Sequence, residues 1–189
     1  MIMKSAAKVT IVNMVVRSDF LNVESKKIDL SSLASSLEDW NGKYDAECFP
    51  SLFLKDPNGR ATVLLFGSGK IIMTGIRSER EARETLDKLA ERLKTELDVV
   101  PNKKYDVINV VARCDVDAEV DLDAAFLKLK NALYDPSLFP ALIYRSKDPK
   151  FVALIFKNGK INVVGIKNEH DAPRAVELIL DALDGCIDE

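Results

Sequence analysis

Side chains that could catalyse a reaction or bind a metal are few in this sequence, and their spacing fits no reactive site. Residues 115–123 read DVDAEVDLD, an alternation of acids that could suggest a divalent-ion loop. An EF-hand loop needs glycine at its sixth position, where Val120 stands. His170 is the only histidine and has no cysteine or acid beside it in a ligand pattern. We therefore expect a solvated loop, a surface histidine at a helix start, and neither metal nor cofactor.

Composition narrows the class of protein further. The chain has 189 residues, 47% hydrophobic and 30% charged, which is typical of a globular protein. It contains no P-loop, no G-x-S-x-G motif and no cysteine–histidine pair with a plausible partner, so no enzyme is expected. Cys48, Cys114 and Cys186 are too widely spaced for a disulfide framework and fit a reducing compartment. The net charge of −3 argues mildly against a nucleic-acid binder, although a basic face can exist within an acidic total.

Four phenylalanines offer a different chemistry, the stacking of flat apolar rings. Phe49 and Phe66 are 17 residues apart, and so are Phe139 and Phe156. Proline follows the first ring of each pair, and x-x-Gly-Lys follows the second. A single phenylalanine in such a place is best explained by core packing. Four at matched positions favour rings that are held out of the core to contact something else.

These matched positions belong to an internal duplication. Residues 48–77 align with residues 138–167 without a gap at an offset of 90, and VTIVNMVVRSDF aligns with YDVINVVARCDV at an offset of 96. Two copies make a duplication rather than a solenoid. We expect a single domain over 1–189, with repeat 1 at about 1–98 and repeat 2 at about 103–189.

Each repeat predicts a strand, a helix, three short β segments and a closing helix. The pattern places first strands at Val9–Val16 and Val107–Ala112, first helices at Leu30–Glu38 and Leu122–Leu133, and β segments at Ser51–Lys55, Arg60–Phe66 and Lys70–Thr74. Ser78 and Glu81 form a capping-box pattern before a helix whose apolar face is Ala82, Leu86, Leu89, Leu93 and Leu97. The last helix should begin near Asp171, because Pro173 fits only a first turn.

Both faces of the predicted sheet are apolar. In Arg60–Phe66, one face carries Thr62, Leu64 and Phe66, and the other carries Ala61, Val63 and Leu65. Two helices per repeat can cover only one face. The uncovered face is therefore a candidate binding surface.

The doubled pattern F-P-x-L … L-I/L-F-x-x-G-K-x-x-x-x-G resembles the core domain of the TATA-binding protein family, of the archaeal type, over nearly the whole chain. The resemblance implies an α+β fold: a pseudo-two-fold duplicated saddle, with a curved antiparallel sheet of about ten strands and four helices on the convex side. It also implies binding and bending of AT-rich, TATA-like double-stranded DNA through the minor groove during transcription initiation. A transcription factor B-like initiation factor is the implied protein partner.

The resemblance assigns roles to matching residues. The two phenylalanine pairs would wedge between base steps. Asn13 and Asn109 would donate hydrogen bonds to the acceptors that A·T pairs display in the minor groove. The surrounding floor would comprise Val15, Val111, Leu64, Leu154, Ile72, Thr74, Asn162 and Val164. A basic rim, matched across the repeat, would contact phosphates: Lys55, Arg60 and Lys70 in the first half, and Arg145, Lys150 and Lys160 in the second.

Several positions depart from the family pattern. Val12 and Ile108 stand where glutamine commonly precedes each central asparagine, Val164 replaces a threonine, and Ser137 replaces an acid that contacts transcription factor B. A divergent paralogue with a regulatory or protein-binding role therefore stays open as the alternative, and an accessory domain of a nuclease or glycosylase is a third hypothesis. The expected location is cytoplasmic and nucleoid-associated in an archaeal cell, or nuclear in a eukaryote. A homodimer through the apolar face is expected for the DNA-free state.

Overall fold

The computed structural model describes residues 8–23 and 27–187, so residues 1–7 of the predicted first repeat lie outside the described part. The first repeat contains β1 (Thr10–Ser18), α1 (Leu30–Ser36), the 3-10 helix η1 (Glu38–Trp40), β2 (Lys43–Asp45), β3 (Phe49–Lys55), β4 (Thr62–Phe66), β5 (Ile71–Ile76) and α2 (Glu79–Leu97). The second contains β6 (Asp106–Asp115), α3 (Leu122–Lys128), β7 (Ala132–Leu133), β8 (Ala141–Lys147), β9 (Lys150–Phe156), β10 (Lys160–Ile166), η2 (Glu169–Asp171) and α4 (Ala172–Ala182).

The strands pair antiparallel with their neighbours in each repeat. Their hydrogen-bonded order is β2-β3-β4-β5-β1 in the first and β6-β10-β9-β8-β7 in the second, and the ten described strands belong to one sheet. The predicted α+β class, with an antiparallel sheet and four α-helices in the described residues, is confirmed. The chain divides into two compact units, residues 13–108 and residues 1–12 with 109–189.

Two helix predictions were wrong at their C-terminal ends. The helix expected over Leu122–Leu133 ends at Lys128, and Ala132–Leu133 is an edge strand paired with β8. The helix expected over Leu30–Glu38 ends at Ser36, and a 3-10 turn follows that buries Trp40. In both places tertiary packing overrides a helical periodicity of only two turns, because such short helices have little stability of their own.

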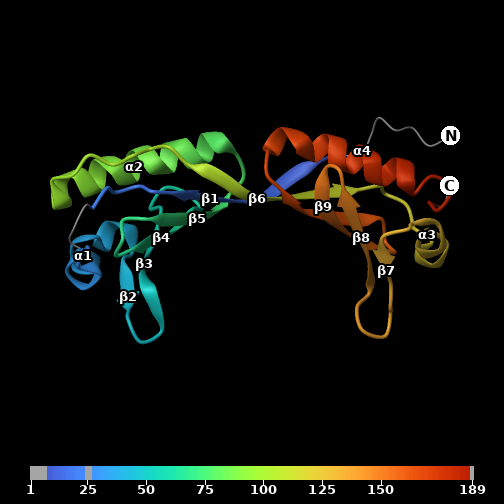
Figure 1. Cartoon of the computed structure of the whole chain (residues 1–189), viewed down its shortest axis with the longest axis horizontal. Coiled ribbons are helices and arrows are strands. Elements are labelled where there is room, and N and C mark those ends of the chain that lie inside the picture. Colours follow the sequence, from blue (N-terminus) through green and yellow to red (C-terminus); the bar gives the residue numbers. More distant parts are fainter. Residues whose placement is uncertain (1–7, 24–26, 188–189) are drawn as a thin grey trace. The chain divides into compact units, whose positions relative to one another are not determined.

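One face of each half-sheet forms the core with the long helix of that half (Figure 1). In the first unit, α2 buries Ala82, Leu86, Leu89 and Leu93 as its periodicity predicts, whereas Leu97 in the last turn is only half-buried. The inward side chains of the strands are Met14, Val16, Leu52, Leu54, Val63, Leu65, Ile71 and Met73, all at most 1% exposed. In the second unit, α4 buries Ala172, Ala175, Val176 and Ile179, while β6, β9 and β10 contribute Val110, Ala112, Ala153, Ile155, Ile161 and Val163.

Local signals in the sequence set the starts of both long helices. The Ser78 hydroxyl accepts a hydrogen bond from the backbone N–H of Glu81 at 3.2 Å, and the Glu81 carboxylate accepts one from the N–H of Arg77 at 3.0 Å. Pro173 lies in the first turn of α4 after the cap residue Asp171, as predicted. The Ser78 contact satisfies a backbone donor that the start of α2 leaves unpaired, and the proline at the start of α4 has no N–H that needs a partner.

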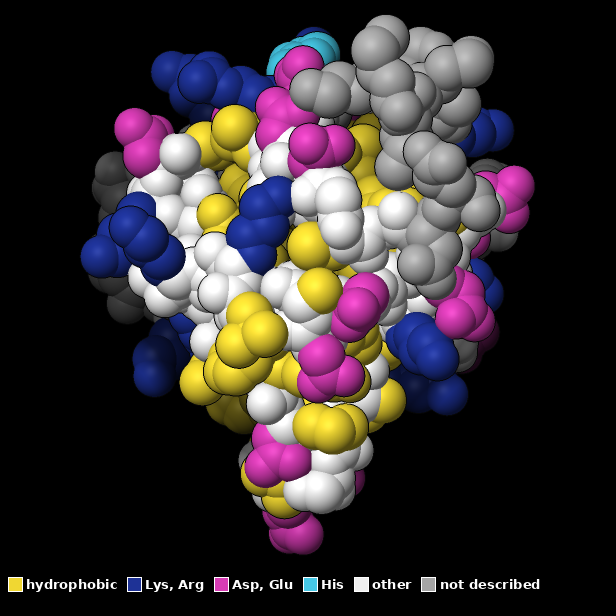
Figure 2. Space-filling view, turned by 90° about the vertical axis from the view of Figure 1, so that its right-hand side faces the viewer, with side chains coloured by type: hydrophobic (Ala, Val, Ile, Leu, Met, Phe, Trp, Pro, Cys, Tyr) yellow, Lys and Arg dark blue, Asp and Glu magenta, His cyan; other side chains and the backbone are white. Residues whose placement is uncertain are grey.

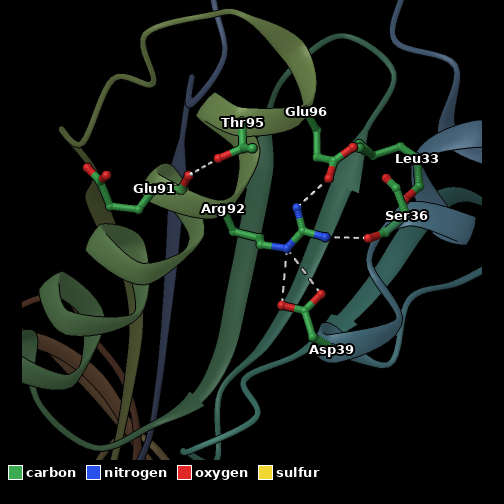
Figure 3. A network of polar contacts seen from close by, with 7 residues as sticks. All are labelled: Leu33, Ser36, Asp39, Glu91, Arg92, Thr95 and Glu96. Carbon is green, nitrogen blue, oxygen red and sulfur yellow. Dashed lines mark hydrogen bonds and ion pairs between the residues drawn. The ribbon is translucent and has the colours of Figure 1, made fainter.

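A polar network joins α2 to the short helices of its own unit (Figure 3). Arg92 of α2 donates to both carboxylate oxygens of Asp39, at 3.2 and 3.1 Å, and also to Glu96 and to the backbone carbonyl of Ser36. The pKa of Arg92 is raised above its ordinary value, first by the hydrogen bond to Glu96. The guanidinium thus stays charged and ties α1 and η1 to the helix that covers the sheet.

A buried carboxylate fixes the turn between β3 and β4. Asp56 is 3% exposed and accepts hydrogen bonds from Thr85 Oγ1 at 3.1 Å, Lys88 Nζ at 3.0 Å and the backbone N–H of Asn58 at 3.0 Å. Burial by itself would raise the pKa of Asp56, but these hydrogen bonds, that of Lys88 foremost, hold it below its ordinary value.

Because the folded state favours the ionised form of Asp56, its contribution to stability is present above the unfolded-state pKa and is lost as pH falls through the lower folded-state pKa. We expect Asp56→Ala to lower the free energy of unfolding by about 2 kcal/mol at pH 7. The difference between wild type and variant should shrink on acidification. Denaturant unfolding at pH 7, 4 and 3 measures it, and a difference that grows toward pH 3 would contradict this account.

Candidate nucleic-acid interface

The four predicted wedge residues form two aromatic pairs outside the core. Phe49 opens β3 and Phe66 closes β4, and their ring centroids lie 6.3 Å apart at an interplanar angle of 61°. Phe139 and Phe156 repeat this geometry at 6.3 Å and 63°. Phe49 is 50% exposed and Phe139 41% exposed. Edge-to-face contact fixes each ring by its partner rather than by the core.

The pairs occur because β3 and β4, and likewise β8 and β9, are antiparallel neighbours in matched register. Ser51 lies opposite Phe66 and Ala141 lies opposite Phe156. Phe49 and Phe139 stand two positions before Ser51 and Ala141, so each lies beside the second ring of its pair. This is the physical reason for the constant spacing of 17 residues: the hairpin returns the chain to the same end of the sheet.

The predicted floor residues all lie on the face opposite the helices. The residue before each of them is buried, whereas they are themselves half-exposed: Val15, Val111, Leu64, Leu154, Ile72, Thr74, Asn162 and Val164. The structure thus gathers the floor of each half on one surface with the aromatic pair of that half. Most of these side chains are apolar, so the face offers few polar groups and an unpaired polar ligand atom placed against it would lose its hydrogen bonds to water.

The two central asparagines have the same orientation in both halves. Asn13 Oδ1 accepts a hydrogen bond from the backbone N–H of Gly75 at 2.9 Å, and Asn109 Oδ1 accepts one from the N–H of Gly165 at 2.9 Å. Both glycines lie at irregularities in strand register, where β5 and β10 bulge. The Thr74 hydroxyl adds a contact to Asn13 Oδ1 at 3.3 Å. With its oxygen turned toward a donor of the protein, each amide offers chiefly its two N–H donors for further hydrogen bonds.

The six predicted rim residues are exposed, but they are not all equally available. Lys55 Nζ donates to the backbone carbonyl of Arg60 at 2.8 Å, and Lys70 lies 3.7 Å from Asp19. Within the described ranges, no ion pair shorter than 4 Å involves the side chains of Arg60, Arg145, Lys150 or Lys160. The second half therefore presents more unpaired positive charge.

Sequence reasoning missed two arginines on the same face. Arg17 and Arg113 occupy matched positions and are exposed, and their strand neighbours are buried. The predicted strands ended at Val16 and Ala112, just before each arginine, whereas β1 and β6 continue to Ser18 and Asp115. Side chains two residues apart in a strand share a face, so extending the series Asn13, Val15 and the series Asn109, Val111 by two residues leads to these arginines. Phe53, 48% exposed on β3, was missed as well.

Arg17 borders a groove beside one of the aromatic rings. The groove, of about 580 Å³, is lined by Phe66 and Ile72 and by the cations Arg17, Lys70 and Lys104, with Asp19 and Asp106 among its other residues. Arg17 lies 3.4 Å from Asp106. Asp19 and Asp106 therefore offset part of the positive charge of this groove in the free protein.

The acidic run that could have suggested an ion site has structural uses. Asp115 Oδ1 accepts a hydrogen bond from the N–H of Asp117 at 3.1 Å, and Asp121 caps α3 by accepting from Asp123 and Ala124. Over residues 8–23 and 27–187, no group of three or more His, Cys, Asp or Glu side chains could hold a metal ion. No helix in that part of the chain is long and apolar enough to cross a membrane.

Comparison with known proteins places this geometry in a family. Residues 8–95 and 104–186 match the family described as transcription factor TFIID, or TATA-binding protein. The TATA-box-binding protein of Methanocaldococcus jannaschii is 38% identical over 177 residues, which cover 93% of each chain. That of Thermococcus sibiricus is 40% identical over 154 residues, covering 79% of this chain and 82% of the relative. The solved structure of Methanococcus jannaschii TBP matches with a TM-score of 0.81 at 36% identity, covering 94% of this chain and 99% of that one. The chain belongs to the TATA-binding protein family.

Proposed function

We propose that the protein binds AT-rich, TATA-like promoter DNA in the minor groove, bends it, and recruits initiation factors to start transcription. The observation that carries this proposal is that each half has two phenylalanines in edge-to-face contact at the border of an apolar sheet face. The first ring of each pair, Phe49 or Phe139, is exposed. The family and its archaeal relatives, which are named for TATA-box binding, support it. The chain acts as one domain made of two repeats.

In this mechanism each aromatic pair enters a base step and replaces stacking that the bend removes. The asparagine amides donate to adenine N3 and thymine O2, the acceptors displayed at A·T pairs. A guanine amino group would add a donor where the face offers donors and apolar side chains, and leaving it unpaired costs free energy. Rim lysines and arginines contact phosphates and supply affinity without sequence information.

A transcription factor B-like protein is the partner that we propose for the second half. Leu133 at the end of β7 is 60% exposed and Leu138 in the β7–β8 loop is 84% exposed. Hydrophobic and acidic side chains lie side by side on this end of the second half (Figure 2). Ser137 donates to Asp135 through its hydroxyl at 2.6 Å and its N–H at 3.0 Å. These hydrogen bonds lower the pKa of Asp135, so the loop keeps a negative charge.

Because Ser137 stands where the family pattern has an acid, Ser137→Glu should strengthen docking of an archaeal transcription factor B about threefold, the size of one exposed charge pair. The factor is titrated onto preformed protein–DNA complex and the dissociation constants are compared. Ser35→Glu on α1 of the first half is the matched control and should leave docking unchanged. Equal strengthening by both variants would show a charge effect that does not depend on this loop.

The decisive test of DNA binding is a fluorescence-transfer assay on an end-labelled duplex across a salt series. Wild type should increase transfer on an AT-rich duplex much more than on a GC-rich duplex of equal length. Absence of binding to both duplexes at low salt would sink the proposal and favour a paralogue that uses this face for protein binding.

Sedimentation of the free protein with and without duplex tests whether two copies pair through the sheet face until DNA replaces the second copy.

The basic rim gives a separate quantitative expectation. Each phosphate contact contributes about 0.9 to the slope of log affinity against log salt. Lys150→Ala/Lys160→Ala should therefore reduce the magnitude of the slope by about 2. Lys94→Ala, at the exposed end of α2 on the helix side, should leave the slope unchanged. A slope that responds equally to both variants would show that the rim is not the phosphate contact.

A further inference from the structure

Two rows of side chains cross the exposed face, one in each half. Strand register aligns Arg17, Ile72, Leu64 and Phe53 as the first row, and Arg113, Asn162, Leu154 and Ile143 as the second row. Each member is half-exposed or exposed. The rows occupy matched positions of the duplication and differ at two of them: Phe53 corresponds to the equally apolar Ile143, whereas Ile72 corresponds to the polar Asn162.

The two arginines that begin the rows make different contacts. Arg17 Nε and Nη2 each lie 3.4 Å from Asp106 Oδ2. Arg113 Nε instead donates to Asn162 Oδ1 at 3.2 Å. The guanidinium of the first row is therefore held by a carboxylate, whereas that of the second row is held by an amide on the face itself.

Asn162 consequently resembles the two central asparagines in its orientation. In Asn13 and Asn109 a glycine N–H occupies the amide oxygen, and in Asn162 the donor is Arg113. An amide oxygen that is held by a donor of the protein is turned toward that donor and has one lone pair left, so the amide offers chiefly its N–H donors and is a poorer acceptor for the amino hydrogen of guanine. Among the described residues of the exposed sheet face, the second half thus has Asn109 and Asn162 in this orientation, and the first half has Asn13.

We propose that Asn162 is a specificity-determining residue that restricts one base pair of the second half-site to A·T, and that Arg113 is the positioning residue that keeps its amide oxygen occupied. This rests on the proposed minor-groove function. The first half has no counterpart at that position, because Ile72 has no hydrogen-bonding group in its side chain. The two half-sites are therefore read differently, and an asymmetric AT-rich site should be bound preferentially in one direction.

The test uses base pairs that differ only in the minor-groove amino group. Replacing adenine by 2,6-diaminopurine, one position at a time, adds this group to an A·T pair, and inosine·cytosine pairs lack it. Wild type should lose roughly tenfold in affinity at the position that Asn162 contacts. Arg113→Met, which frees the amide oxygen to accept the amino hydrogen, should reduce that loss to about threefold or less. Arg113→Met/Asn162→Ile should restore the loss, because no acceptor then remains.

Arg17→Met is the matched control, because it removes the arginine of the first row, which contacts a carboxylate and no amide. It should change affinity uniformly and alter no single position. Both arginines are exposed, so the variants should fold, and thermal unfolding checks this. A cleavage reagent attached to Cys48, the exposed cysteine beside Phe49, marks the first-half end of the bound site, since Cys114 and Cys186 are buried.

The outcomes separate this inference from the function beneath it. If wild type binds the AT-rich duplex, and Arg113→Met keeps the full diaminopurine loss at every position, the roles of Asn162 and Arg113 are overturned while minor-groove binding stands. If wild type does not bind the duplex, or binds diaminopurine and adenine duplexes equally, the proposed minor-groove function fails and this inference fails with it.

Discussion

Phe139→Ala/Phe156→Ala should lower affinity for an AT-rich duplex about 100-fold and remove the bend at the second half of the site. Base–aromatic stacking contributes about 1–3 kcal/mol per base by alanine substitution, and the variant removes two rings that also support each other at 6.3 Å. Fluorescence transfer on the labelled duplex measures both affinity and bend. Phe49→Ala/Phe66→Ala should have a comparable effect at the other end of the site, since the geometry of the first pair is the same.

Phe126→Ala is the matched control for exposure. Phe126 is 42% exposed, close to the 41% of Phe139, but it lies on α3 and outside the sheet face. Its loss should leave affinity and transfer unchanged. If the control and the wedge variant weaken binding equally, or if the wedge variant bends DNA as wild type does, the rings are not the groups that enter the base steps.

Gly69→Ala should destabilise the fold by at least about 3 kcal/mol, because two effects coincide. Gly69 has φ +81°, in the left-handed region that glycine favours, and a Cβ atom there would lie 2.1 Å from the backbone oxygen of Leu21. The Leu21 carbonyl cannot easily move away from Gly69, because the Leu21 N–H donates a hydrogen bond to Gly69 O at 2.9 Å and holds the two segments together. Gly159 repeats the arrangement against Ala118 at 2.2 Å.

Gly185→Ala measures the cost of the left-handed backbone conformation without the steric clash that Gly69→Ala adds. Gly185 has a similar φ of +76°, but a Cβ atom there would meet nothing within 4 Å, so about 1 kcal/mol is expected. Denaturant unfolding of the two variants measures the difference. Equal destabilisation would show that backbone conformation alone explains the glycine. Because Gly69 N–H donates to Phe66 O at 2.8 Å, the folded fraction of Gly69→Ala should also bind DNA more weakly.

The glycine of the G-K motif thus connects fold and site. The turn at Gly69 sets the position of Phe66 on one side, through its carbonyl, and of Lys70 on the other, because Phe66 N–H donates to Lys70 O at 2.9 Å. One tight turn, which packs against Leu21 in the segment after β1, thus positions both the predicted wedge Phe66 and the predicted rim residue Lys70. The motif F-x-x-G-K therefore has a physical origin in both repeats.

The sequence alone determined the duplication, the α+β class and the alternation of faces, whereas the residues of the predicted interface were named by the resemblance to the family. The duplication, class and faces follow from period and spacing: apolar residues two apart lie on one side of a strand, and equal spacing in two copies gives equal geometry. The helix starts were also readable: Ser78 accepts a hydrogen bond within the first turn of α2, and the proline in the first turn of α4 fits only a helix start. The wedge, floor and rim roles stay predictions for the experiments above.

Tertiary structure decided what depends on contacts distant in sequence. The end of α3 at Lys128 and the strand at Ala132–Leu133 depend on pairing with β8, which no local periodicity reports. The occupation of the Asn13, Asn109 and Asn162 oxygens depends on partners 49 to 62 residues away, brought adjacent by strand register and bulges. Side-chain orientation of this kind is set by cross-strand hydrogen bonds, and only the folded sheet brings those donors together.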